Sequence, residues 1–148
     1  MEWHYRKFNE LSNNELYNLL KARVEVFVVE QDCPYPELDD YDQKAVHCYL
    51  DIKGEPAALV RLLPAGSKFE HPSIGRVMVA EKHRGKGYGK EVMKRAMAYI
   101  TEVWSEDSIH IMAQEYLKQF YMSLGFRQAS EMYLEDNIPH IDMIWERS

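Results

Sequence analysis

Residues 73–92 constrain the fold of this chain more than any other stretch. The apolar run Ile74–Val79 has the character of a strand, and an amphipathic pattern typical of a helix extends from Val92 to Trp104. Between them lies the loop Arg84-Gly85-Lys86-Gly87-Tyr88-Gly89-Lys90. Glycine adopts backbone angles closed to other residues, so successive N–H groups can point at one anion where a helix begins. A surface turn could have the same composition, but the order of strand, basic glycine loop and helix favours a phosphate cradle.

Two well-known phosphate loops do not match these residues. The nucleoside-triphosphatase loop G-x-x-x-x-G-K-[ST] needs wider glycine spacing and a hydroxyl after its lysine, whereas Glu91 follows Lys90. The dinucleotide fingerprint G-x-G-x-x-G fails because Lys90 and Val92 stand where its third glycine is required. The sequence therefore supports neither ATP chemistry nor hydride transfer.

The loop does fit the pattern [Q/R]-x-x-G-x-[G/A], through Arg84, Gly87 and Gly89, and the chain resembles the GNAT superfamily of acyl-CoA-dependent N-acyltransferases. A second region agrees: a strand-like run at 109–113 precedes residues 114–126, which resemble the tyrosine-bearing helix of that superfamily and its Gly-Phe exit. Residues 23–35 and 135–143 resemble the ElaA-like branch. The resemblance spans nearly the whole chain.

The remaining patterns predict an α+β fold in a single domain, residues 1–148. Ser12 and Glu15 form a capping box, which starts a helix whose apolar face extends to Phe27. Expected strands cover residues 3–8, 46–52, 56–62, 73–79, 109–113, 127–133 and 140–145. The resemblance implies a GNAT-like three-layer α/β/α arrangement, with a mostly antiparallel, twisted central sheet that is splayed between its two central strands.

The composition of the chain limits the classes of binding partner that can be expected. The formal net charge of −6 argues against nonspecific nucleic-acid binding, which depends on basic stripes. Since no apolar run of 18 residues or secretion signal is found, we expect no membrane partner and a cytoplasmic location. Cys33 and Cys48 are expected as reduced thiols, and no metal-ligand spacing is present. Exposed strands would permit a homodimer, although no residue pattern specifies one.

The resemblance implies acetyl-CoA as the cosubstrate. Its pantetheine arm would pair with the backbone of residues 77–79, and its pyrophosphate would bind the glycine loop. The implied cofactor-binding residues are Val77, Met78, Val79, Arg84, Gly85, Lys86, Gly87, Tyr88, Gly89, Lys90 and Gln114. Gln114 stands where many relatives carry asparagine, and Leu117 where a small residue is common. These two positions depart from the family pattern.

Transfer to an amine needs an acid and a base. Tyr121 lies four residues before Gly125, at the position of the family's acid, and would protonate the leaving thiolate. A lysine-like amine has a pKa near 10.4, so a base must remove its proton at neutral pH. Glu30 is the first candidate; His47 and His140 are weaker ones, both expected on the acceptor side. Each of the three also has an ordinary structural interpretation, as a paired charge, a strand residue and a hydrogen-bonded imidazole.

An acidic segment, with Glu37, Asp39, Asp40 and Asp42, could attract an amine, although a solvated charge run is the commoner explanation. The adjacent residues 33–36 could shape the same entrance. The sequence thus predicts an N-acetyltransferase that acts by direct attack of a small-molecule or peptide amine. The alternative is a noncatalytic acyl-CoA-binding sensor or interaction module. The acceptor amine is left open.

Overall fold

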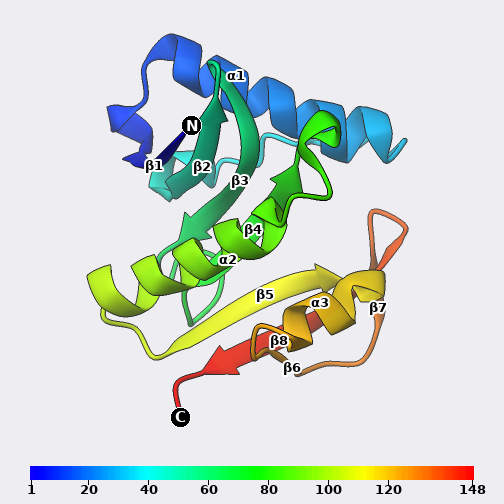
Figure 1. The fold of residues 1–148 in the computed structure, drawn as a ribbon. Coiled ribbons are helices and arrows are strands. Elements are labelled where there is room, and N and C mark those ends of the chain that lie inside the picture. Colours follow the sequence, from blue (N-terminus) through cyan, green and yellow to red (C-terminus); the bar gives the residue numbers. More distant parts are fainter.

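One eight-stranded sheet runs through the molecule, and the structure, a computed structural model, describes all residues from 1 to 148 (Figure 1). The strands are β1 Glu2–Lys7, β2 Val46–Ile52, β3 Glu55–Leu63, β4 Ser73–Val79, β5 Ser108–Gln114, β6 Arg127–Gln128, β7 Tyr133–Glu135 and β8 Ile138–Glu146. Their order is β1-β2-β3-β4-β5-β8-β6, with β7 paired to β8, and every pairing except β4 with β5 is antiparallel. This confirms the expected mostly antiparallel sheet.

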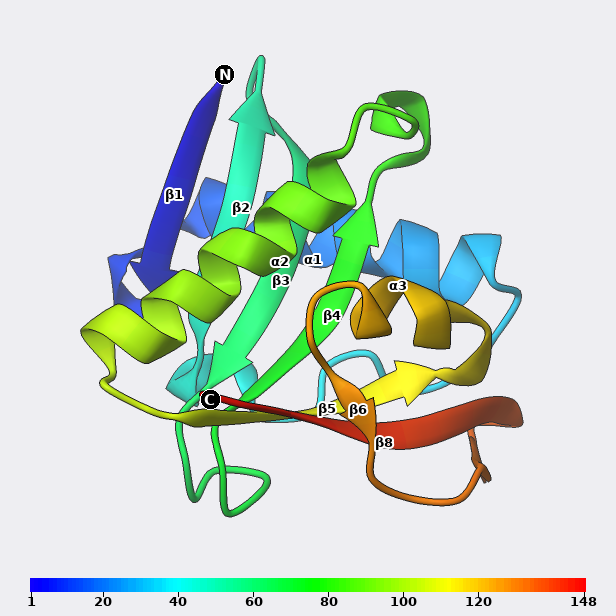
Figure 2. The same cartoon turned by 60° about the horizontal axis from the view of Figure 1, so that its bottom comes forward.

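Three α-helices cover the two faces of this sheet. They are α1 Asn13–Val24, α2 Tyr88–Ala98 and α3 Lys118–Met122. A π-helical segment, Glu25–Glu30, continues α1, and another, Tyr99–Val103, continues α2. Helix α1 lies behind the sheet, whereas α2 and α3 lie in front of it (Figure 2). The helices and sheet therefore form the three layers that the family resemblance implied.

Side chains that alternate along β2 and β3 build a core on each face. Tyr49 and Leu59 pack with Leu19 of α1, while Cys48 and Val60 belong to the larger core under α2. A strand sends successive side chains to opposite faces, and helices cover both faces here, so most residues of these strands are buried. The capping box at the start of α1 is present, because the Glu15 N–H donates to Ser12 Oγ at 3.1 Å and the Ser12 N–H donates to Glu15 Oε1 at 2.7 Å.

Two expected elements are shorter than the sequence pattern indicated. The single helix expected over 114–126 is a 3₁₀ turn, Glu115–Leu117, followed by the five residues of α3. The strand expected over 127–133 is two short strands, β6 and β7. The intervening chain leaves the ladder, and Ser130 Oγ accepts a hydrogen bond from the Asp142 N–H of β8. Local side-chain bonding replaces strand pairing at that point.

The sheet opens between β4 and β5. The two strands pair only at Ser73 and His110, beside the bond from the His110 N–H to the Pro72 carbonyl at 2.9 Å. Beyond it, residues 74–79 have no partner on β5. A β-bulge lies in this part of β4, where the register with β3 shifts and Arg76 has a φ of +53°. Bulges bend a strand and redirect side chains, often beside functional sites, and this one lies where the sheet splays.

A membrane-spanning helix requires a length and a hydrophobicity that none of the helices described above combines.

Candidate functional site

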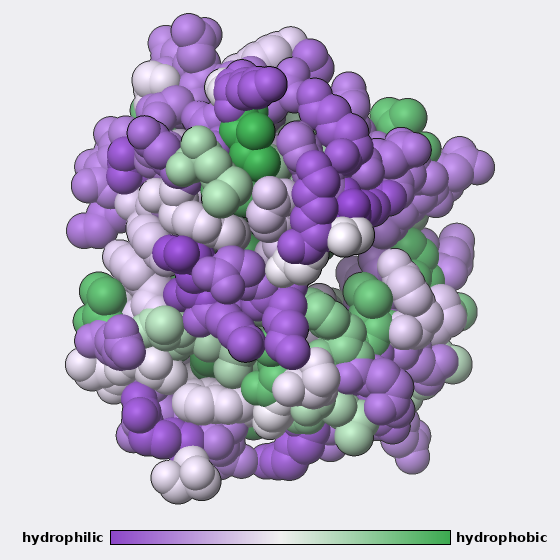
Figure 3. All heavy atoms as spheres, viewed as in Figure 1, coloured by the Kyte–Doolittle hydropathy of each residue, from purple (hydrophilic) through white to green (hydrophobic).

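The opening between β4 and β5 contains a cavity of about 370 Å³. Residues from both halves of the sheet line it: β4 contributes 74–77, β5 contributes Ile111, Met112 and Gln114, and the segment 31–41 closes one side. In Figure 3 the surface is hollowed at this place, with hydrophilic side chains above the hollow and more apolar ones below it. A concave site with apolar walls and a few polar groups is the usual form of a small-molecule site.

The β4 edge supplies main-chain groups to this opening. Met78 and Val79 pair with Leu59 and Ala58 of β3, whereas Val77 lies in the bulge, and none of the three has a ladder partner on the β5 side. An extended ligand arm can pair with such an edge as an added strand would. Val77 itself lines the cavity, so the expected pantetheine segment leads directly into it.

The glycine loop has the geometry of an anion cradle. Gly85 and Gly87 have φ values of +80° and +82°, a region that favours glycine. Gly87 is the N-cap of α2 and supplies no side chain, so the first N–H groups of an eleven-residue helix have no capping partner. At Gly89 a Cβ would lie 3.6 Å from the Val79 side chain, so the helix starts close against β4. These features fit a diphosphate at the end of the strand that would hold the pantetheine.

Arg84 and Glu30 form a pair that the sequence did not indicate. Arg84 donates to both carboxylate oxygens of Glu30, at 2.6 and 2.9 Å, and its Nε donates to the Val79 carbonyl at 3.0 Å. The pair ties the glycine loop to the segment after α1. Lys86 and Lys90 form no ion pair and are exposed, so they carry the free positive charge of the loop. Glu30 does not line the cavity, and this position does not favour it as the base.

Tyr121 of α3 reaches the cavity from the core. Its side chain is 6% exposed, and its ring packs edge-on against Phe120 and Phe126. The hydroxyl has no hydrogen-bond partner within the protein. Burial raises the pKa of Tyr121, so the phenol stays protonated at neutral pH. A protonated hydroxyl that faces the cavity is suited to donate a proton.

The two candidate histidines lie in different surroundings. His140 of β8 lines the cavity, and its Nδ1–H donates to the Ile138 carbonyl at 2.7 Å, because a carbonyl can only accept. The lone pair is then on Nε2. His47 is only 4% exposed and does not line the cavity; its Nε2 lies 3.1 Å from the Asp42 carbonyl. Burial lowers the pKa of His47, which therefore has the environment of a neutral structural imidazole.

Gln114 of β5 lies opposite His140 on β8 and also lines the cavity. Its Nε2 donates to Gln31 Oε1 at 3.4 Å. The glutamine side chain, which is longer than the asparagine common in relatives, therefore lies beside the segment after α1. Cys33, Tyr35 and Pro36 line the cavity as well, so most of the segment 33–36 does border it.

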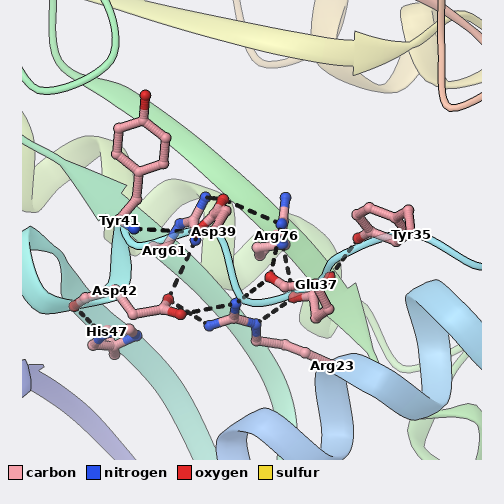
Figure 4. A network of polar contacts seen from close by, with 9 residues as sticks. All are labelled: Arg23, Tyr35, Glu37, Asp39, Tyr41, Asp42, His47, Arg61 and Arg76. Atoms are coloured by element: carbon pink, nitrogen blue, oxygen red, sulfur yellow. Dashed lines mark hydrogen bonds and ion pairs between the residues drawn. The ribbon is translucent and has the colours of Figure 1, made fainter.

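A charged network forms one wall of the cavity (Figure 4). Its ionic members are Arg23, Glu37, Asp39, Asp42, Arg61 and Arg76. Arg23 donates to Glu37 at 2.6 Å and to Asp42 at 2.7 Å, and Arg61 donates twice to Asp39 at 2.8 Å. Arg76, on the bulge, donates from Nε to Glu37 at 2.7 Å. Three guanidiniums face three carboxylates, so the formal charges of the network cancel.

This network corrects the interpretation of the acidic segment. Glu37 and Asp42 are 4% and 6% exposed, and Asp39 is partly buried, so only Asp40 of the four is solvated. The other three are held by arginines and do not form a free acidic surface. Their partners lie 14 to 39 residues away in sequence. No local signal distinguishes a solvated acidic run from one that meets distant arginines.

The network makes the fold sensitive to acid. Burial alone would raise the pKa of Asp39, but hydrogen bonds from Arg61 and the charges of Arg61 and Arg76 outweigh it and lower the pKa to about 2. An unfolded aspartate titrates near 3.9, so below about pH 4 the unfolded chain binds protons that the folded chain does not. We expect the free energy of unfolding, measured in urea, to fall as the pH drops from about 4 toward 2. Asp39→Asn should flatten this decline and the exposed Asp107→Asn should not; an unaltered decline in Asp39→Asn would contradict the assignment.

Comparisons with known proteins agree with this geometry. A family model described as an acetyltransferase (GNAT) domain matches residues 10–147. Protein ElaA of Escherichia coli is 39% identical over 148 residues, which cover 99% of this chain and 97% of ElaA. A UPF0039 protein of Schizosaccharomyces pombe is 39% identical over 97% of this chain and 95% of its own length.

Solved structures show the same similarity. A crystal structure of an acyl-CoA N-acyltransferase from Pseudomonas aeruginosa superposes with a TM-score of 0.93 at 38% identity, over 97% of this chain and 98% of that one. The crystal structure of E. coli ElaA gives a TM-score of 0.92 at 38% identity, over 99% of this chain and all of the other. The family suggested by the sequence motifs is therefore confirmed over nearly the full length.

Proposed function

Because this chain belongs to the GNAT acetyltransferase family, we propose that it transfers an acetyl or related short acyl group from acetyl-CoA to a primary amine of a small molecule or peptide. The observation that supports this most strongly is the shared cavity: Val77 at the unpaired β4 edge, Tyr121 and His140 all line it. These are the three kinds of group that aminolysis of a thioester needs, namely main-chain donors, an acid and a base.

The reaction would proceed by direct attack. The amine nitrogen bonds to the thioester carbonyl carbon, and the bond from that carbon to sulfur breaks. A main-chain N–H of residues 77–79 stabilises the negative charge that develops on the carbonyl oxygen. The Tyr121 hydroxyl gives its proton to the departing sulfur, and the amine loses a proton to a base. No covalent bond to the protein forms at any step.

His140 is better placed than Glu30 to act as that base. The Ile138 carbonyl holds its ring and leaves Nε2 with a lone pair in the cavity, whereas the Glu30 carboxylate is engaged by Arg84. His47 lies outside the cavity. We therefore propose His140 as the proton acceptor and the pairing of Glu30 with Arg84 as an anchor of the glycine loop.

An amine library tests the proposed function. The protein is incubated with acetyl-CoA and individual primary amines, and free thiol and product mass are followed. At least one amine should raise thiol release well above hydrolysis and yield a product heavier by one acetyl group. Tight binding of CoA without any amine-dependent release would favour the acyl-CoA sensor instead. Absence of CoA binding by folded protein would refute the site altogether.

The role of His140 has its own expected result. His140→Gln should lower turnover about tenfold at pH 7, where most of a lysine-like amine is protonated. The defect should shrink as the pH rises toward 10, because more of the amine is then neutral without help. Glu30→Gln, assayed at saturating acetyl-CoA, should remain within about threefold of the parent. If Glu30→Gln lowered turnover about tenfold and His140→Gln left it nearly unaltered, Glu30 would be the base instead.

A further inference from the structure

Two cations that line the cavity have nitrogen atoms with no hydrogen-bond partner in the protein. Lys68, in the loop between β3 and β4, forms no ion pair; its Nζ lies 5.5 Å from the ring centre of Tyr41 and 5.7 Å from that of Phe69. Arg76 uses Nε and Nη2 in the charged network, and its Nη1 has no hydrogen-bond partner. In Figure 4 this end of Arg76 and the Tyr41 ring both extend from the network on the side away from α1.

The charge at this end of the cavity is positive. The three guanidiniums of the network are balanced by its three carboxylates, and Lys68 adds a further positive charge that forms no ion pair, with Asp39 and Glu135 as its nearby carboxylates. Partial burial and the charges of Arg61 and Arg76 lower the pKa of Lys68 and outweigh the opposite effect of Asp39 and Glu135, which indicates that the cations lie close enough to repel one another. An anion placed among them would relieve that repulsion. The Tyr41 hydroxyl, also without a protein partner, adds one more donor.

The cavity lining also contains free carboxylates. Glu135, at the end of β7, and Asp136, in the turn that follows, line the cavity, are exposed and form no ion pair. His140, the proposed base, follows them on β8. A molecule that carries both charges would therefore place its ammonium toward this turn and its anionic group toward Lys68.

We propose that the acceptor carries an anionic oxygen group, a carboxylate or a phosphate, on the same small molecule as its amine, and that Lys68 and Arg76 Nη1 bind this group. The inference deepens the proposed function and rests on it. Lys68 is a specificity residue in this view, since it touches the acceptor at a distance from the reacting atoms. The bulge in β4 also has a role in this proposal. It orients the Arg76 guanidinium so that one of its edges faces the network and the other faces the cavity.

The test compares acceptors in matched pairs. Amino acids such as lysine and phenylalanine are compared with 1,5-diaminopentane, 2-phenylethylamine and the amino-acid amides, and 2-aminoethyl phosphate with ethanolamine. At saturating acetyl-CoA, the anionic member of at least one pair should have a kcat/KM about tenfold higher or more, the effect of one charge-assisted hydrogen bond. The pair that shows it identifies carboxylate or phosphate. Equal use of charged and uncharged members would overturn the inference and leave the acetyltransferase function standing.

Two variants locate the effect. Lys68→Met should lower kcat/KM for the anionic acceptor about tenfold and bring the preference within each pair close to one. Lys94→Met removes an exposed, unpaired lysine on α2 and should leave the preference unaltered. Calorimetry with CoA-saturated protein measures the same pairs without turnover. If Lys68→Met keeps the full preference, or if the anionic members bind no more tightly than their counterparts, this anion site does not exist.

Discussion

Tyr121→Phe is expected to lower thiol release about 100-fold at saturating acetyl-CoA and amine. A positioned acid typically contributes 10²- to 10⁴-fold, and the phenol is the one group on α3 that lines the cavity with a free hydroxyl. Without it the thiolate must leave unprotonated or take its proton from water. The affinity for acetyl-CoA should hardly alter, because the substitution leaves untouched the main chain of β4 and the glycine loop, which are the proposed binding groups.

The substitution Tyr121→Phe removes the acidic hydroxyl and leaves the packing of the ring unaltered. The Tyr121 hydroxyl makes no hydrogen bond within the protein, and phenylalanine retains the ring contacts with Phe120 and Phe126. Thermal stability should therefore stay close to that of the parent. Tyr116→Phe is the matched control, since Tyr116 is 75% exposed and lies one turn away. Unimpaired turnover in Tyr121→Phe would remove this residue from the mechanism and leave the family assignment intact.

Asp42→Asn is expected to destabilise the fold by about 3–5 kcal/mol, the range typical when one partner of a buried ion pair is removed. The Asp42 carboxylate accepts hydrogen bonds from Arg23 at 2.7 and 3.2 Å and from Arg61 at 3.2 Å, and both arginines are almost completely buried. Asparagine has nearly the same shape but no charge, so the two guanidiniums would be left with excess positive charge away from water.

Equilibrium unfolding in urea measures this loss. Asp107→Asn makes the same chemical change in an exposed pair with Arg147 and should cost less than about 1 kcal/mol. Since a domain of this size has about 5–15 kcal/mol of stability, the Asp42 variant should still fold but with a much lower midpoint. Similar midpoints for the two variants would mean that water reaches the network and screens it. The fold would then not depend on these pairs.

Local signals were sufficient for features that depend on the backbone of a short stretch. The glycine loop could be identified because positive φ at Gly85 and Gly87 is a property of single residues, and the capping box at Ser12 because its two bonds span three residues. The strands β2, β3, β4 and β5 followed from their apolar runs. The strands after Gly125 were harder to predict, because Ser130 accepts a hydrogen bond from β8 and interrupts what looks in the sequence like one continuous strand.

Side-chain roles depended on contacts between distant segments. Glu30 and Arg84 are 54 residues apart, and nothing near either one shows that they pair. His47 and His140 were equivalent in sequence, yet the fold buries the first beside Asp42 and leaves the second in the cavity. Lys68 gave no sequence signal at all, because a lysine in a loop is ordinarily solvated.

The amino-acid sequence by itself was enough to indicate the family, through motifs that resemble GNAT acyltransferases, and that resemblance implied the three layers. The glycine loop, proposed here as a phosphate cradle, was recognisable because the conformational range of glycine is a property of single residues within a short stretch. The tertiary structure alone decided which charged groups are buried and which are free. Pairing of a charge depends on what folding brings within a few ångströms, and that distance is independent of separation along the chain. The balance of three arginines against three carboxylates, with Lys68 in excess, exists only in the folded protein.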